Sequence, residues 1–247
     1  MSLINLKKSF IDSGLLKNMT DIHSHILFGV DDGIKVYEDT VTSLQWLKNN
    51  GINHIYLTPH VMSDFPKNTT AFLTESFDLL KERLENDRVA GIPELRLGAE
   101  YMLESAIEKH KSDGFITYKD RQILVETSYI TPPMGFISIL ENLMEDGYYP
   151  ILAHPERYIY MDKNDYDFLK AQGIKFQLNF LSMIGAYGHI EKHKAIMLLN
   201  EDYYNYAGSD FHNLNRHKDF FYTKSLKRKH IEKLQLLFNN NNELWQD

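Results

Sequence analysis

Seven short strand-like segments alternate with longer segments of helical periodicity along this chain, and that alternation limits the fold. The predicted strands are Met19–His23, His54–Thr58, Leu95–Ala99, Gln122–Glu126, Tyr149–Ala153, Lys175–Asn179 and Tyr204–Gly208. Between them, segments such as 36–51 and 68–87 carry apolar residues three and four positions apart, as amphipathic helices do. Strands that alternate with helices form βα units around a parallel sheet, so the chain is predicted to be α/β. The rhythm alone does not choose between an open sheet and a barrel.

The residues at the strand ends favour a barrel. Six of the seven predicted strands end in metal-ligand side chains, which are His23 and His25, His60, Glu100, Glu126, His154, and Asp210 and His212. In an α/β barrel the carboxyl ends of all strands meet at one mouth, where the active site forms. The i, i+2 spacing of His23 and His25 puts both rings on one face of an extended segment, and the same spacing recurs at the seventh strand.

The loop after the first strand adds a further ligand candidate. Asp32 is favoured over Asp31, and Gly33 is expected to free the turn. Together with Glu100, Glu126 and Asp210 this residue would bring four negative charges into one cleft. Such crowding is expected to raise carboxyl pKa values and to oppose folding unless cations balance it. Two divalent ions neutralise the four charges and three leave +2, which would attract a phosphate dianion. Imidazole and carboxylate ligands suit Mn, Fe, Zn or Co better than Mg or Ca.

A metal cluster would support hydrolysis without a cysteine nucleophile, and the chain has no cysteine. The pKa of a metal-bound water falls from 15.7 to roughly 7, so hydroxide is present at neutral pH. Arg157 and Arg216 follow the fifth and seventh strands, and guanidinium groups pair with phosphate oxygens in a bidentate way. These residues point to phosphoester hydrolysis rather than peptide or deaminase chemistry. His60 and Asp210 are both candidates for proton transfer.

The remaining sequence predicts a single domain over 1–247 in the cytoplasm. A net charge of −7 with acids and bases intermixed argues against a nucleic-acid partner. No apolar run approaches the roughly 18 residues of a membrane span, and no secretory signal is evident. Residues 1–18 form an extension, predicted to pack on the domain as an amphipathic helix. His189 and His193 have helical metal-pair spacing, but no glutamate lies between them as HExxH requires, so a surface helix is predicted.

The ordered motifs resemble those of a known superfamily. The segments "DIHSHILFGVDDG", "TPH", "GAE", "VETS", "AHPERY" and "SDFHN" are similar to the polymerase and histidinol phosphatase (PHP) superfamily, and most of all to its bacterial protein-tyrosine phosphatases of capsular and exopolysaccharide synthesis. The resemblance implies a distorted seven-stranded α/β barrel of the TIM-like type with two or three metal ions, often manganese. Its motifs carry over the ligands His23, His25, Asp32, His60, Glu100, Glu126, His154, Asp210 and His212. Arg157 and Arg216 match positions that hold the substrate phosphate.

The substrate implied by this resemblance is phosphotyrosine on a bacterial tyrosine kinase that governs polysaccharide export. The main alternative is a small-molecule phosphatase acting on histidinol phosphate or a similar monoester. A regulatory module whose metals only stabilise the barrel is disfavoured, because the ligand set is complete. A nuclease is disfavoured by the acidic balance and by the lack of a polymerase domain. The oligomeric state is left open.

Overall fold

The computed structural model describes residues 7–246, and the main strands of this part form a parallel barrel. Its strands are β2 (Met19–Asp21), β3 (Ile52–Leu57), β4 (His60–Val61), β5 (Glu94–Leu97), β6 (Glu100–Met102), β7 (Gln122–Glu126), β8 (Tyr149–Ala153), β9 (Lys175–Asn179) and β10 (Tyr206–Gly208). Two parallel ladders run in the orders β2-β3-β5 and β4-β6-β7-β8-β9-β10. Pro59 separates β3 from β4, and proline cannot donate a ladder hydrogen bond. The two ladders are joined because β3 runs on into β4, and β5 into β6.

The ring closes where the segments after β2 and β10 meet. Ser24 and Phe211 form an isolated parallel bridge. The amide of Asp210 donates to the carbonyl oxygen of His23 over 2.9 Å, and the amide of His25 donates to Phe211 over 2.8 Å. Within residues 7–246, the predicted distorted α/β barrel is therefore confirmed, and each predicted strand end lies within two residues of the observed one.

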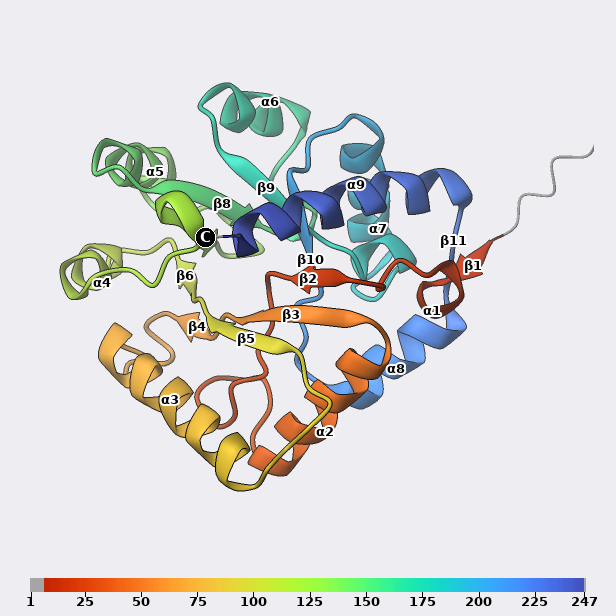
Figure 1. Cartoon of the computed structure of the whole chain (residues 1–247). Coiled ribbons are helices and arrows are strands. Elements are labelled where there is room, and N and C mark those ends of the chain that lie inside the picture. Colours follow the sequence, from red (N-terminus) through yellow and green to blue (C-terminus); the bar gives the residue numbers. More distant parts are fainter. Residues whose placement is uncertain (1–6, 247) are drawn as a thin grey trace, which may run out of the picture.

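Helices surround the barrel, as Figure 1 shows. They are α2 (Tyr37–Asn49), α3 (Thr70–Asn86), α4 (Ile107–Asp113), α5 (Phe136–Glu145), α6 (Lys163–Ala171), α7 (His189–Asn200), α8 (Leu214–Thr223) and α9 (Arg228–Trp245), with short 3₁₀ turns η1 (Lys119–Arg121), η2 (Pro155–Arg157) and η3 (Ser182–Ile184). The exposed His189 and His193 lie on α7, as predicted. Among residues 7–246, no helix combines the length and the apolar character needed to cross a bilayer.

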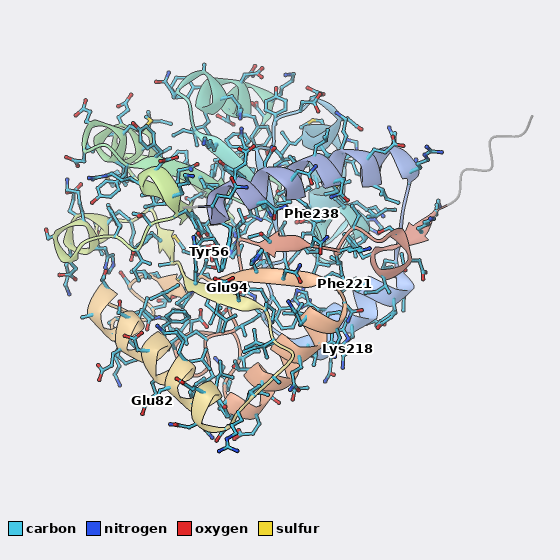
Figure 2. All side chains as sticks on the ribbon, viewed as in Figure 1. Tyr56, Glu82, Glu94, Lys218, Phe221 and Phe238 are labelled. Atoms are coloured by element: carbon cyan, nitrogen blue, oxygen red, sulfur yellow. The ribbon has the colours of Figure 1, made fainter. Side chains whose placement is uncertain are left out.

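The N-terminal extension differs from the predicted amphipathic helix. Residues 1–6 lie outside the described part of the chain. From there, β1 (Lys8–Ser9) pairs antiparallel with β11 (Ser225–Leu226), and α1 (Phe10–Ser13) is a single turn. Phe10 is fully buried, with ring centroids 5.2 Å from Phe180 and 5.4 Å from Phe221, which Figure 2 labels. The buried Phe10, Leu15 and Leu16 and two strand residues therefore attach this segment, where a longer helix was expected.

A buried cluster fills the barrel on the amino-terminal side of the predicted site. It consists of Ile22, Tyr56, Tyr118, Leu124, Ile151, Ala153, Tyr206, Leu244 and Trp245. Tyr56 lies edge-on to Tyr118 at 4.7 Å and to Trp245 at 5.1 Å between ring centroids. Ile22 and Leu124 precede His23 and Glu126 along their strands, so this packed floor supports the polar residues above it.

The asparagine run 239–242 completes the barrel between β2 and β10, which do not pair directly. Figure 1 shows α9 alongside both strands. Asn241 is fully buried, and its amide donates to the carbonyl oxygens of Thr20 (2.8 Å) and Ala207 (2.6 Å). Its oxygen accepts from the Ala207 amide over 3.1 Å. One side chain thus satisfies backbone groups that a strand ladder would otherwise pair.

We expect Asn241→Ala to destabilise the fold strongly. Removing the amide leaves buried backbone groups on β2 and β10 without partners, at a cost on the order of 3 kcal/mol or more. The matched control is Asn239→Ala in the same run, because Asn239 is exposed. Urea unfolding of both variants measures the difference. Equal stability of the two variants would contradict this role for Asn241.

Candidate metal centre

The carboxyl end of the barrel gathers the predicted ligand side chains into one cluster. Potential donor atoms lie within 4.8 Å of one another in four overlapping groups, which are His25, Asp32, His60 and His212; His23, His25 and Asp210; His23, Glu100 and His154; and His60, Glu100 and Glu126. Every one of the nine predicted residues belongs to at least one group. Asp32 and His212 lie at the rim with side chains 59% and 26% exposed, whereas the other seven residues are buried.

Glu100 lies at the centre of this cluster. Its Oε2 is 3.1 Å from His23 Nε2, 3.3 Å from His25 Nε2 and 3.2 Å from His60 Nδ1. Within the described chain this oxygen, His60 Nδ1 and Glu126 Oε1 are buried without a well-aligned hydrogen bond, although His60 Nδ1 and Glu126 Oε1 lie 2.8 Å apart. Buried polar atoms are normally paired. Lone pairs that converge without pairing fit a cation between them, so this donor set fits the metal cluster that the sequence implies.

Neighbouring side chains orient the histidines. His25 Nδ1 lies 2.7 Å from Asp31 Oδ2, and His23 Nδ1 lies 2.9 Å from Gln177 Oε1. Each contact directs the opposite ring nitrogen, Nε2, toward the pocket. A carboxylate or amide behind a metal-binding histidine fixes its tautomer and ring orientation. Asp31 is therefore a partner of His25, while Asp32 faces the pocket with Oδ1 3.4 Å from His212 Nε2.

Asp210 faces two ways. Its Oδ1 lies 3.4 Å from His25 Nε2 and 3.6 Å from His23 Nε2, on the side of the ligand cluster. Its Oδ2 accepts hydrogen bonds from Arg157 Nη1 and Asn179 Nδ2, each over 2.9 Å. This carboxylate therefore connects the candidate ligands to one of the predicted phosphate-binding arginines.

Charge in the pocket is balanced by the imidazoles. Burial and the neighbouring His25 both lower the pKa of His60, but the carboxylates of Glu100 and Glu126 outweigh them and raise that pKa to about 9. Burial disfavours charge on Glu100, yet the surrounding imidazoles hold its pKa well below the usual range. The pKa of Asp210 is lowered in the same way against its burial. The expectation that crowding raises these carboxyl pKa values is therefore wrong for Glu100 and Asp210, because imidazoles separate the acids.

The backbone is shaped around the site at several points. His154 and Asp210 adopt positive φ angles of 34° and 52°, which are uncommon for residues with a Cβ and cluster at functional sites. Gly208 lets β10 lie close to His23, since a Cβ at position 208 would be 2.6 Å from His23 Cβ. Gly33 was expected to free the turn. Its actual role is close approach, because a Cβ would lie 2.1 Å from the His25 carbonyl oxygen.

Of the two predicted arginines, Arg157 lies beside Asp210 and Arg216 lies at the exposed rim. Arg157 ends η2, and its guanidinium lies 4.4 Å from the ring centroid of Tyr129 and 4.3 Å from that of Tyr187. Arg216 lies on α8, donates from Nη2 to the Ala186 carbonyl oxygen over 3.3 Å and is 5.0 Å from the Tyr187 ring centroid. The structure therefore links both arginines through one tyrosine.

Sequence reasoning missed several residues of this site. Gln177 and Asn179 lie on β9, the one predicted strand without a histidine or acid at its carboxyl end, and their i, i+2 spacing there was the available signal. Tyr129 follows Glu126 by three residues, which places it at the same mouth. Tyr187 lies in the connection between η3 and α7, and no local pattern distinguishes it from a packing aromatic residue.

Fold and site together define a class of protein. A parallel α/β barrel with imidazoles and carboxylates gathered at the carboxyl ends of its strands is a barrel protein with a candidate polynuclear metal centre, as in the polymerase and histidinol phosphatase superfamily. The family pattern described as "Capsular polysaccharide synthesis, CpsB/CapC" matches residues 19–244. The chain therefore belongs to the CpsB/CapC family.

Named relatives agree with this assignment. Tyrosine-protein phosphatase CpsB of Streptococcus agalactiae is 28% identical over 206 residues, covering 80% of this chain and 84% of the relative. Tyrosine-protein phosphatase YwqE of Bacillus subtilis is 29% identical over 203 residues, covering 79% and 78%. A crystal structure from work on YwqE of Bacillus subtilis and CpsB of Streptococcus pneumoniae, described as unique metal-dependent tyrosine phosphatases, superposes with a TM-score of 0.72 at 25% identity, covering 87% of this chain and 84% of that one.

Proposed function

We propose that this chain is a metal-dependent protein-tyrosine phosphatase, a phosphoric monoester hydrolase. The observation that carries the proposal is the convergence of four overlapping ligand groups with Arg157 hydrogen-bonded to one of their members, Asp210. Such a pocket provides cation ligands and an anion-binding side chain side by side, which is the combination that metal-dependent hydrolysis of a phosphomonoester uses. The names of the relatives support the same activity.

The ligand set would hold two or three divalent ions, and we propose manganese, with iron, zinc and cobalt as alternatives that the same donors accept. The proposed ligands are His23, His25, Asp32, His60, Glu100, Glu126, His154, Asp210 and His212. Bound ions supply Lewis acidity and lower the pKa of water in such a pocket. Glu100 contributes to two of the four groups and is the proposed central ligand.

The chain's own side chains bind and orient the phosphate. Arg157 and Arg216 hold its non-bridging oxygens, since guanidinium groups match that geometry. His60 and Asp210 are the candidates for moving a proton to the leaving tyrosyl oxygen. His60 Nδ1 lies 2.8 Å from Glu126 Oε1, a contact that orients the imidazole ring.

The proposed substrate is phosphotyrosine on a bacterial tyrosine kinase that regulates capsular or exopolysaccharide synthesis, acted on in the cytoplasm. We propose that residues 1–247 form one catalytic domain. The family's link to capsular polysaccharide synthesis supports this choice. The alternative is a small-molecule phosphomonoesterase such as histidinol phosphatase, which the ligand cluster alone would equally support.

Side-by-side assays test the substrate. Metal-loaded protein, with metals quantified in the same sample, is given a phosphotyrosine peptide, a phosphoserine peptide and histidinol phosphate. We expect kcat/KM for the phosphotyrosine peptide to exceed the other two at least about tenfold, which is about 1.4 kcal/mol in the transition state. Faster histidinol phosphate turnover would overturn the substrate and keep the reaction. Tight phosphopeptide binding without turnover of any substrate would identify a binding module.

A further inference from the structure

Tyr187 contacts both predicted phosphate-binding arginines. The Arg157 guanidinium lies 4.3 Å and that of Arg216 5.0 Å from the centroid of its ring. Tyr129 contacts Arg157 as well, at 4.4 Å. A guanidinium within about 6 Å of an aromatic centroid is attracted by the ring's negative face. The shared ring therefore favours bringing two cations close together, which would otherwise repel each other.

The hydroxyl of Tyr187 connects the same residue to the candidate ligands. It accepts a hydrogen bond from Asn179 Nδ2 over 2.8 Å and donates to Asp210 Oδ2 over 3.3 Å. Arg157 and Asn179 donate to that same oxygen. The ring and the hydroxyl of Tyr187 thus act on two different parts of the site, the arginines and the Asp210 carboxylate.

The local backbone holds this side chain in place. Gly185 and Gly188 flank Tyr187 closely in the chain, and their φ angles of 85° and 132° strongly favour glycine. Arg216 donates to the carbonyl oxygen of Ala186 in the same segment. The exposed Arg216 side chain therefore has two contacts to the segment 185–188, one to its backbone and one to the Tyr187 ring.

We propose that Tyr187 is a positioning residue for phosphate binding, whose ring pre-orders Arg157 and Arg216 while its hydroxyl holds Asp210. The proposal rests on the proposed function, because it gives a role to a residue of the same site. Long side chains lose rotamer freedom when they bind a ligand. Ordering both arginines in advance removes that cost from phosphate binding. The ring, more than the hydroxyl, should therefore determine phosphate affinity.

Calorimetric titration of the metal-loaded protein with inorganic phosphate tests this without requiring turnover. Tyr187→Phe keeps the ring, so we expect phosphate affinity within about twofold of the wild type. Tyr187→Leu removes the ring, so we expect about tenfold weaker binding with unchanged metal content, in line with the strength of cation–π contacts. If Tyr187→Leu does not fold, Tyr187→Met removes the ring while keeping more of the side-chain bulk.

Double-mutant cycles with Arg216→Ala distinguish the effect of the Tyr187 ring, which contacts both arginines, from that of the Tyr129 ring. Tyr187→Leu and Arg216→Ala should weaken phosphate binding by less than the product of their single effects, because both remove one contact. Tyr129→Leu and Arg216→Ala together should weaken phosphate binding by the product of their single effects, since Tyr129 contacts Arg157.

Several outcomes would overturn the proposal. They are unchanged phosphate affinity in Tyr187→Leu, equal losses in the Phe and Leu variants, and a loss that follows lower metal content. Wild-type turnover of the phosphotyrosine peptide, measured in parallel, distinguishes the two levels of inference. If the wild type is an active phosphatase and Tyr187→Leu does not change phosphate affinity, only the role of Tyr187 is refuted. If the wild type is inactive, the proposed function is refuted, and the phosphate affinities of the variants still decide the role of Tyr187 in binding.

Discussion

Stripping the metals from this protein with a chelator is expected to abolish phosphotyrosine hydrolysis while leaving the barrel folded. The sequence contains no cysteine that could replace activated water as the nucleophile. The fold should persist because imidazoles can balance the buried acids, as the raised pKa of His60 and the lowered pKa of Glu100 indicate. In the stripped protein, protons on the imidazoles then neutralise the carboxylates, as metal ions do in the loaded protein.

The stripped protein should nevertheless be less stable than the loaded one. An ion that binds only the folded state stabilises it by about 4 kcal/mol when free metal is a thousand times Kd. Turnover, circular dichroism at 25 °C and Tm, measured before stripping, after stripping and after adding back manganese, test all parts of the expectation. Full turnover in protein shown to be metal-free would refute the proposed reaction. Unfolding at 25 °C on stripping would refute only the expectation that the imidazoles balance the buried acids without metal.

The sequence could locate this site because ligand chemistry repeats at strand ends. His23 with His25, and Asp210 with His212, share an i, i+2 spacing that is meaningful only if their segments are extended and parallel. Since the carboxyl ends of a parallel barrel converge, residues nearly two hundred positions apart could be grouped before any coordinates were known. Asp32 lies in a candidate ligand group, whereas Asp31 contacts His25 Nδ1, and the choice of Asp32 as ligand stays a prediction.

Contacts that depend on packing between distant segments were not predictable in the same way. Tyr187 reaches Arg157 and Arg216 from a connection without periodicity, so only the assembled barrel reveals its role. Asn241 lies in a run of four asparagines without hydrophobic periodicity, yet its amide bonds backbone groups on β2 and β10 that no strand ladder pairs. The extension 1–18 was predicted as an amphipathic helix, but among its described residues only Phe10–Ser13 is helical, because Lys8 and Ser9 pair with β11 instead.

Replacing Glu100 with glutamine should be the most damaging single conservative change at the site. The shape is kept, but the carboxylate charge is lost, and an amide nitrogen or a weaker oxygen must face the ring nitrogens of His23, His25 and His60. Because Glu100 takes part in two ligand groups, we expect the variant to lose at least one ion per chain. We also expect kcat/KM of this variant to fall about a thousandfold, which corresponds to about 4 kcal/mol in the transition state.

The matched control is Glu94→Gln, because it makes the same change on the β5–β6 strand pair. Figure 2 labels Glu94, whose side chain is 66% exposed and lies 4.0 Å from His54 Nε2. Contacts between exposed charges contribute little, so this variant should keep its metals and its activity. Metal analysis and kinetics on both proteins decide the issue. Normal metal content and turnover in Glu100→Gln would remove Glu100 from the centre, since no ion held by its carboxylate would then support the reaction.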